Sequence, residues 1–513
     1  MALIRLLVWL CVSLATVACA EDLYSRPLSD CANNGNGTGY NCAVTPGAAG
    51  AYRGNGNVLQ GAGVGKVSDG DTLFVCGFHD GGAADAGLTP TVNMTIDFNC
   101  PYDPGTILAA YIKFTSGWYG PDVFGVYSQN PVTGCPWHMA QMIDGAPVYL
   151  TKRTGVPDST WKAGDWSQPG GCSTTYYVKP YAGLSANTVA LYTNVNTIID
   201  VVNVRVALKS PRIIGLTQDW AIKFTNADFS TVYNHVLKKC AQACIGIFNA
   251  SDDVEILDGD ISEAGNGIYT YSGTTAGNSN RLLVMRNKIH DLDQKRFFSP
   301  FTNDAHAIGI QGGDDMVVVD NDMSHIPGSC ITLYTAVGQS MKRNVIGNNH
   351  CEDVNDLSAL TKLNQDAYEI GSTNAGHVAN DVVDNVITGN TATNVAGNCI
   401  KIKPSHATVG RDLKVTGNTL IHCGSALRWY DDEDGDIGFE YTHNRSLDNV
   451  RHIEHIQNGT DSLVNVKIDT NLYYTDGSGK FEWNGAISDF AAWKTNSGLD
   501  SHSVMSLVPI AVE

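Results

Sequence analysis

Short runs that alternate apolar and polar residues recur along the C-terminal two-thirds of the chain. The runs are Ala221–Phe224, Cys244–Phe248, Gly267–Tyr271, Ala307–Gln311, Cys330–Tyr334, Ala367–Gly371, Cys399–Lys403, Ala426–Tyr430 and His452–His455. Aligned on their first apolar residue after the entry position, they are 23, 23, 40, 23, 37, 32, 27 and 26 residues apart. Alternation predicts short strands with one buried face. Imperfect steps of this size indicate stacked units that share one core.

An asparagine precedes each of the last six runs. These residues are Asn287, Asn321, Asn348, Asn390, Asn418 and Asn444. Stacked asparagine side chains can bond to one another and to the backbone of a turn. Several short strands per unit, without crossover helices, predict an all-β fold, a right-handed parallel β-helix. An antiparallel sandwich is the alternative, but it does not explain the fixed offset between asparagine and strand.

That offset predicts two inserted loops. It is 10, 10, 9 and 9 residues after Asn321, Asn390, Asn418 and Asn444, but 21 after Asn287 and 20 after Asn348. Two units therefore carry about ten extra residues immediately before the same strand. We expect the loops 291–305 and 353–366 to rise from one edge of the coil, two units apart, and to mark its binding face.

Composition divides the rest of the chain. We expect a secretory signal peptide at 1–20, an N-terminal cap with the first β segments at 21–99, an inserted β-rich module at 100–185, the β-helix core at 186–465 and a C-terminal cap at 466–513. Twelve of the 14 cysteines lie outside the signal segment. We therefore expect disulfides and a secreted or periplasmic protein.

The charge balance limits the partners. The net charge is −19, which disfavours nucleic acid and anionic lipid as ligands. No stretch after the signal segment is long and apolar enough for a membrane span. We expect a monomer. An anionic polymer would need a local basic patch or bound cations.

Alternation also predicts which side chains face outward from the recurring strand. The first outward column is Tyr269, Gly309, Thr332, Glu369, Lys401, Arg428 and Glu454, and the second is Tyr271, Gln311, Tyr334, Gly371, Lys403 and Tyr430. At the strand entry stand Asn266, His306, Ser329, Asp366, Asn398, Ser425 and Arg451, with Asp304 close by. The plain alternative is a solvated ladder in which Glu369 pairs with Lys401. We favour a site, because the charged residues lie beside two long loops.

The repeats, the asparagines and the run from Asp304 to Gly313 resemble the right-handed β-helix proteins of the pectate-lyase-like superfamily. The resemblance implies the fold, and it leaves polysaccharide lyases, glycoside hydrolases, epimerases and binding proteins open. Motifs of polygalacturonase-type hydrolases are matched only loosely, by Asp314-Asp315 and Lys401-Ile402-Lys403, and we do not assign that family.

The leading hypothesis is a lyase that cleaves a uronic-acid polymer by β-elimination. Lys401 or Lys403 is then the base, with a pKa lowered by neighbouring cations, and Arg428 neutralises the substrate carboxylate. His306 or Tyr334 is the acid. Glu369 and Asp366 orient the base or hold calcium, the one candidate cofactor.

Two other functions remain open. A glycoside hydrolase would draw its paired carboxylates from Asp304, Asp366 and Glu369. A non-catalytic carbohydrate-binding or adhesive solenoid would use the same face. In each case we expect the substrate-binding residues to be Tyr269, Tyr271, Gln311, Tyr334 and Tyr430.

Three further features have plainer interpretations. The acidic run Asp431–Asp434 is the better calcium candidate of two such runs, the other being Asp314-Asp315. The Cys240 and Cys244 pair is more consistent with a disulfide than with metal ligands. The tryptophans of the inserted module are expected to pack its core.

Overall fold

The structure is a computed structural model of the chain. It describes residues 20–506 with the exception of 62–64, 80–85, 104, 110–111, 114–117, 131–135, 144–145, 154, 168–174, 187–188, 194–196, 215–219, 241, 272–277, 293–304, 336–338, 355–364, 373–381, 404–411, 432–437, 458–465 and 476–479. The expected signal peptide and both expected loops lie almost entirely outside these residues.

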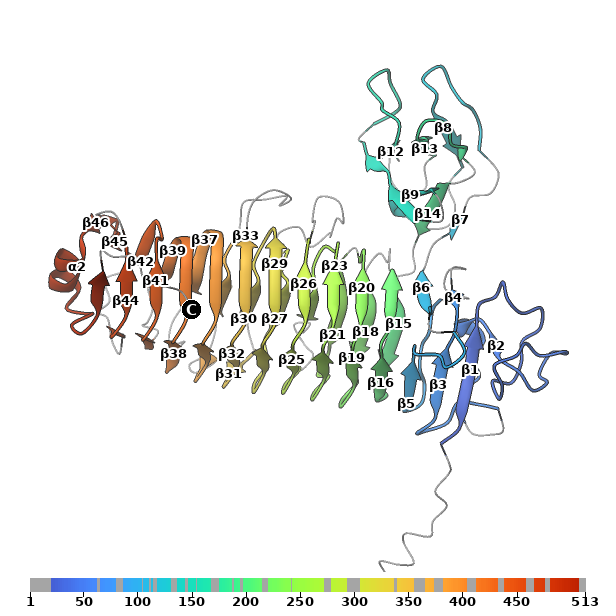
Figure 1. The fold of residues 1–513 in the computed structure, drawn as a ribbon, viewed down its shortest axis with the longest axis horizontal. Helices are drawn as coiled ribbons and strands as arrows, with labels where there is room; N and C mark the ends of the chain where they lie inside the picture. The colour runs from blue at the N-terminus through green and yellow to red at the C-terminus, as the bar shows by residue number, and fades with distance from the viewer. Residues whose placement is uncertain are drawn as a thin grey trace, which may run out of the picture.

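The chain winds into a long right-handed parallel β-helix with three faces (Figure 1). The first face is a 14-stranded sheet of β2 (Tyr52–Arg53), β1 (Asp22–Arg26), β3 (Thr72–Val75), β5 (Met94–Asp97), β16 (Val206–Lys209), β19 (Thr231–Tyr233), β22 (Glu255–Leu257), β25 (Leu283–Met285), β28 (Val317–Val319), β32 (Val345–Gly347), β36 (Val386–Thr388), β38 (Leu413–Thr416), β40 (Phe439–Thr442) and β43 (Lys467–Asp469).

The second face follows the first in every coil. It comprises β4 (Phe78–His79), β6 (Ile107–Ala109), β17 (Arg212–Ile214), β20 (Val236–Lys238), β23 (Asp260–Ser262), β26 (Lys288–His290), β29 (Asp322–Ile326), β33 (His350–Val354), the first halves of β37 (Thr391–Lys403) and β39 (Thr419–Asp431), β41 (Arg445–Leu447), β44 (Leu472–Tyr474) and β47 (Val504–Ser506).

The third face completes each coil and holds the recurring runs. It comprises β15 (Thr197–Val202), β18 (Trp220–Thr225), β21 (Ala243–Phe248), β24 (Ile268–Tyr271), β27 (Ile308–Gln311), β30 (Ile331–Thr335), β34 (Tyr368–Ser372), the second halves of β37 and β39, β42 (Arg451–Gln457), β45 (Phe481–Trp483) and the antiparallel β46 (Ala486–Ser488). A two-stranded pair, β31 (Met341–Lys342) and β35 (Val382–Val383), lies outside the three faces.

The register of the third face is the predicted one. Ile222 pairs with Ile245, and every later aligned residue pairs with the next, up to Leu427 with Ile453. All of these side chains are buried in one core that runs from Leu23 to Trp493. Parallel pairing excludes the antiparallel sandwich. The coil also continues on both sides of 186–465, through β1 to β5 before it and β43 to β45 after it.

An asparagine ladder runs along the turn between the first and second faces. Each side chain donates to the oxygen of the next at about 3 Å, in the order Asn287, Asn321, Asn349, Asn390, Asn418, Asn444 and Asn471. The prediction that Asn348 belongs to the ladder is wrong, because its φ of 53° places it at the left-handed position of the turn. Its neighbour Asn349 is buried and takes the place in the ladder.

The ladder ends at Gly259 for a steric reason. The Gly259 amide donates to the Asn287 side chain at 3.1 Å, but a Cβ on Gly259 would lie 1.9 Å from Nε2 of His235. The buried ring of His235, on the preceding coil, fills the space that a side chain at position 259 would occupy. The glycine and the histidine are therefore one packing unit.

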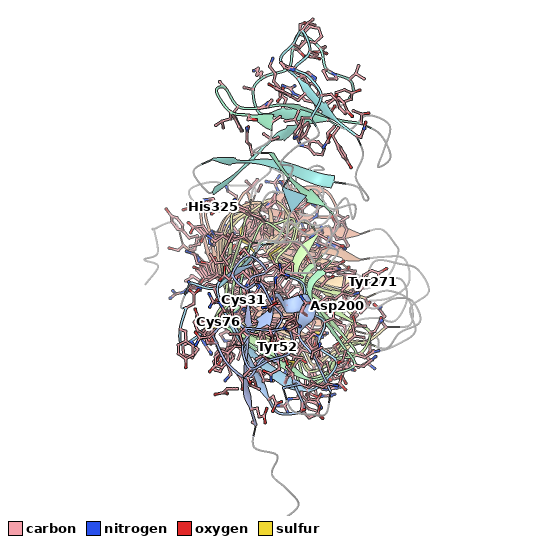
Figure 2. All side chains as sticks on the ribbon, turned by 90° about the vertical axis from the view of Figure 1, so that its right-hand side faces the viewer. Cys31, Tyr52, Cys76, Asp200, Tyr271 and His325 are labelled. Carbon is pink, nitrogen blue, oxygen red and sulfur yellow. A yellow bond between two sulfur atoms is a disulfide. The ribbon has the colours of Figure 1, made fainter. Side chains whose placement is uncertain are left out.

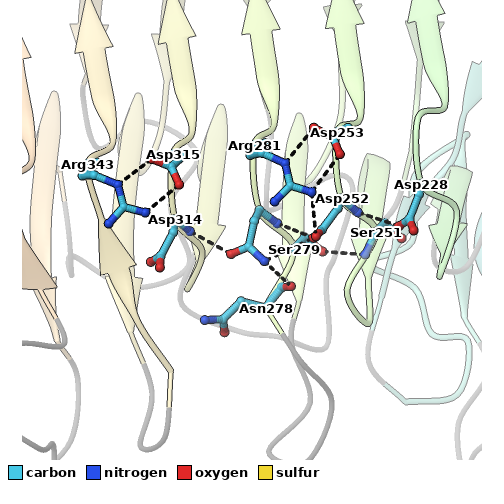
Figure 3. A network of polar contacts seen from close by, with 11 residues as sticks. Asp228, Ser251, Asp252, Asp253, Asn278, Ser279, Arg281, Asp314, Asp315 and Arg343 are labelled. Carbon is cyan, nitrogen blue, oxygen red and sulfur yellow. Dashed lines mark hydrogen bonds and ion pairs between the residues drawn. The ribbon is translucent and has the colours of Figure 1, made fainter.

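The turn between the third and first faces is held by charge pairs between coils (Figure 3). Arg281 contacts Asp253 and Asp252 at 2.8 and 3.0 Å, and Arg343 contacts Asp315 at 2.6 Å. Asp315 thus has an arginine partner, and Asp314 accepts from the Lys342 backbone at 3.0 Å. The Asp314-Asp315 run is structural.

A β-rich module lies between β6 and β15, after the strands β1 to β5, and stands off the tube (Figure 1). One of its sheets contains β10 (Ala146–Tyr149), β9 (Pro136–Ile143), β14 (Val189–Thr193) and β7 (Ile112–Lys113), and the other β11 (Thr151–Lys152), β12 (Asp165–Ser167), β13 (Tyr176–Lys179) and β8 (Tyr127–Gln129). Trp161 and Trp166 are 5% and 1% exposed, so these tryptophans are buried as expected.

The ends of the tube are covered. The helix α2 (Phe490–Ser497) buries Trp493 against the ring of Phe481, and the short 3-10 helix η1 (Asn55–Asn57) lies near the other end. Disulfides are present, as expected. Within the described chain they join Cys31 to Cys42, Cys76 to Cys100, Cys240 to Cys244, Cys330 to Cys351 and Cys399 to Cys423.

Candidate functional site

The predicted outward column forms on the third face. Glu369 of β34 pairs with Lys401 of β37, Lys401 with Arg428 of β39, and Arg428 with Glu454 of β42. These side chains therefore lie on adjacent coils of one surface, at the usual strand spacing of ~4.8 Å.

A buried charge cluster stands at the centre of this column. The Lys401 ammonium lies 2.8 Å from Oδ2 of Asp366 and 3.6 Å from Oε1 of Glu369. Lys401, Asp366 and Glu369 are 7%, 1% and 4% exposed. Buried charges are tolerated only when they are paired in this way. The pairing of Glu369 with Lys401 belongs to the plain ladder alternative too, but a solvated ladder would be exposed.

The surroundings of Lys401 contradict one predicted property. Burial by itself lowers the pKa of Lys401, but the carboxylates of Glu369 and Asp366 outweigh it and raise that pKa above its ordinary value. The prediction assumed neighbouring cations and a lowered pKa. It was wrong because the nearest charges are carboxylates contributed by the preceding coil. Lys401 is a fixed cation, not a ready proton acceptor.

Asp366 is a positioning residue. Its Oδ1 accepts hydrogen bonds from the backbone and side-chain nitrogens of Asn398, at 3.0 and 2.6 Å, while its Oδ2 accepts from Lys401. Both oxygens are used within the protein. Asp366 therefore fixes the strand entry and the ammonium, and it offers no open edge to a substrate.

Arg428 is the more accessible cation. Its side chain is 29% exposed, lies 4.9 Å from the centre of the Tyr430 ring, and its Nε is 3.4 Å from Glu454. Glu454 in turn accepts from Ser425 at 2.5 Å. Burial raises the pKa of Tyr430 despite the nearby Arg428. This guanidinium can meet a carboxylate from solvent.

The remaining predicted residues are arranged around this cluster. His306 is 2% exposed, its ring Nδ1 lies 3.2 Å from the Thr332 hydroxyl, and its amide donates to Asn266 at 2.8 Å. The Tyr269 and Tyr334 hydroxyls contact each other. Lys403 lies on β37, but its side chain falls outside the described part of the structure, as does all of Asp304.

Gln311 and Tyr271 flank the tyrosine contact. Gln311 pairs in register with Tyr334, and the backbone N–H of Gln311 donates to the Thr270 hydroxyl at 2.7 Å. Tyr271 is 40% exposed and projects from one flank of the tube (Figure 2). Four tyrosines thus follow the outward surface on either side of the charge cluster.

The predicted calcium ligands Asp366 and Glu369 both contact the Lys401 ammonium, at 2.8 and 3.6 Å, and calcium binding stays a prediction. In the described part of the chain, no group of three or more His, Cys, Asp or Glu side chains is arranged to hold a metal ion. The other candidate run, Asp431–Asp434, falls outside the described side chains.

Ser425 and Asn398 were assigned only to the strand entry by the sequence, yet both contact the charged residues. The sequence places both residues at the strand entry, next to the charged column. It cannot show that their side chains reach across to the charged residues of a neighbouring coil, because that depends on the side-chain rotamers. No helix among the described residues is long and apolar enough to cross a bilayer.

Comparison with known proteins found similar solved structures at low sequence identity. No family model and no curated protein matches the sequence. XylC in complex with xylose is similar at 12% identity and a TM-score of 0.44, over 94% of this chain and 86% of that one. An exopolygalacturonase from Thermotoga maritima is similar at 11% identity and a TM-score of 0.27, over 82% and 85%. A polygalacturonase from Erwinia carotovora is similar at 13% identity and a TM-score of 0.32, over 78% of this chain and 90% of that one.

Proposed function

We propose that this protein is a polysaccharide-degrading enzyme whose substrate strand lies along the third face. The observation that carries the proposal is the cluster of Lys401, Asp366 and Glu369, buried on an outward surface beside the accessible Arg428. A core has no need of such a cluster, and replacing its three charged groups together would cost the fold little. Flanking tyrosines supply flat surfaces on which sugar rings can lie.

The reaction we propose is β-elimination on a uronic-acid polymer. Arg428 binds the uronate carboxylate, and the fixed charge of Lys401 stabilises the negative charge that develops as the C5 proton leaves. Because Lys401 already carries a proton, the C5 proton passes to Lys403 or to the Glu369 carboxylate. The C4–O bond then breaks, a C4=C5 double bond forms, and His306 or Tyr334 protonates the leaving oxygen.

One observation favours a glycoside hydrolase as the second candidate. The Glu369 carboxylate lies 3.6 Å from the Lys401 ammonium, and a carboxylate in this position suits a general base or nucleophile. Asp366 has no free oxygen, so the partner acid would be Asp304. The two reactions differ in product, because only elimination leaves an ultraviolet-absorbing unsaturated uronate.

The test is a screen of the purified protein against pectate, alginate, glucuronan and neutral glycans. Degradation is measured by the release of reducing ends and by the rise in ultraviolet absorbance. We expect Arg428→Ala and Glu369→Gln to lower kcat/KM on the best substrate by roughly 100-fold, as for loss of one electrostatic contact to a transition state. Arg286→Ala is the matched control, since Arg286 pairs with Asp258 at 2.6 Å on another corner of the tube.

The outcomes are distinct. A rise in ultraviolet absorbance assigns the lyase, and new reducing ends without that rise assign the hydrolase. Wild-type turnover in both site variants would remove the proposed site. Binding without depolymerisation across the panel would instead assign a carbohydrate-binding solenoid.

A further inference from the structure

Aromatic rings gather on the N-terminal coils of the third face. The Trp220 ring lies 4.9 Å from Phe248 in an edge-to-face arrangement and 6.4 Å from Tyr269, and Phe248 lies 5.7 Å from Tyr271. These four residues come from β18, β21 and β24, three neighbouring coils. We refer to Trp220, Phe248, Tyr269 and Tyr271 as the aromatic platform.

Two glycines make room for the platform. Gly246 and Gly309 occupy the same outward column as Glu369 and Lys401. A Cβ on Gly246 would lie 2.4 Å from the Trp220 ring, and one on Gly309 would lie 2.6 Å from the Tyr269 ring. The rings therefore lie across the sheet surface, over positions where other side chains would stand up. This creates a flat strip.

The platform is open and carries a cation. Trp220 forms its base at 4% exposure, whereas Tyr271 is 40% exposed and Phe248 is partly exposed. The Lys223 ammonium lies 5.1 Å from the centre of the Phe248 ring. An apolar ring face beside a positive charge suits a sugar ring that bears a carboxylate.

The platform is continuous with the proposed site. The Tyr269 hydroxyl contacts the Tyr334 hydroxyl, and Tyr334 belongs to β30, which pairs with the Glu369 strand β34. Four coil spacings of ~4.8 Å separate the Phe248 coil from the Glu369 coil, which is about 19 Å. An oligosaccharide of several units spans such a length.

We propose that the aromatic platform binds sugar rings of the same polysaccharide strand, several units from the bond that is cleaved, with Lys223 meeting a uronate carboxylate. The inference rests on the proposed function and adds to it a direction, along the tube axis toward the N-terminal coils. The inference also predicts that long oligosaccharides bind more tightly and are cleaved with a higher kcat/KM than short ones.

The experiment measures chain-length dependence. Size-fractionated oligosaccharides of pectate, alginate and glucuronan are titrated into Glu369→Gln protein to obtain Kd, and kcat/KM is measured with the active enzyme. We expect affinity to rise with length. Phe248→Ala should weaken binding of long oligosaccharides by roughly tenfold and reduce the ratio of long to short kcat/KM by a similar factor.

Three variants make the result specific. Phe248→Tyr keeps a ring and should restore the length dependence. Tyr271→Ala, a change at an exposed side chain, tests the platform without disturbing packing. Phe229→Ala is the matched control, because Phe229 is 56% exposed and lies between β18 and β19, off this face.

The two proposals fail differently. If the wild-type protein neither binds nor degrades any of these polymers, the proposed function fails and the platform inference fails with it. If the wild type degrades a polymer but Phe248→Ala and Tyr271→Ala keep its length dependence, only the platform is overturned, and the rings have a packing role.

Discussion

At the scale of single residues, Lys401 connects stability and function. Among the described residues, its ammonium is the one counter-charge that pairs with the buried carboxylate of Asp366, and Glu369 shares it. Such a group resembles a preorganised electrostatic contact, because its position is fixed before substrate binds. The cost of removing it should therefore appear in folding as well as in catalysis.

We predict that Lys401→Met destabilises the protein by roughly 3–5 kcal/mol, because two carboxylates remain buried without a cation. The measurement is the thermal unfolding midpoint by circular dichroism at one scan rate. The variant Lys401→Met/Asp366→Asn/Glu369→Gln removes the charges together and should recover most of the loss. An unchanged midpoint in Lys401→Met would contradict the buried pairing.

At the scale of one structural element, the asparagine ladder fixes the turn between the first and second faces. Each amide satisfies a backbone group of a neighbouring coil, for example Asn321 to the Val284 carbonyl at 3.0 Å. Unsatisfied buried groups would be costly there. The ladder stops at Gly259, because the ring of His235 fills the space that a side-chain amide at this position would need.

We predict that the ladder can be extended by two coils. Gly259→Asn alone should cost about 1–3 kcal/mol through overpacking against the His235 ring. His235→Asn/Gly259→Asn should be at least as stable as His235→Asn alone, since the new amides can bond to Asn287 and to each other. Thermal midpoints of the three variants test this coupling. Additive losses in the double variant would show that histidine and glycine are not one unit.

At the scale of the whole molecule, the module and the two longest connections from the second face to the third occur at the same corner. The module lies between β6 and β15, and the extra residues of two later coils lie between β26 and β27 and between β33 and β34. Each of these pairs joins the second face to the third. The proposed site and the aromatic platform both lie on this third face of a single long tube (Figure 1).

The tube also buries histidines, which gives a pH prediction. Burial lowers the pKa of His235 and His452 to about 3 and of His455 to about 4. The unfolded chain binds protons near pH 6.5, whereas the folded chain binds them only near pH 3–4. Below pH 6.5 the unfolded state therefore binds more protons, and stability falls as pH decreases through this window.

We expect the thermal midpoint to fall between pH 6.5 and 4.5, above the range in which carboxylates titrate. His235→Asn/Gly259→Asn removes one of the three groups and should show a smaller fall. His325→Asn is the control, because His325 has a side chain 61% exposed. A midpoint that does not change with pH, or equal slopes in all proteins, would contradict the assignment.

The sequence by itself determined the coil and its register, because an alternating run can bury only one of its faces. It also placed Glu369, Lys401 and Arg428 on one outer column. It misassigned Asn348, since two adjacent asparagines have the same local signal and only the left-handed turn geometry distinguishes them. The sequence also named Asp366 and Glu369 as neighbours of the base, but only the tertiary structure decided that Lys401 is buried beside both carboxylates, which raise its pKa, because these residues meet only through stacking. The same holds for the platform, where rings from separate coils share the space that two glycines leave open.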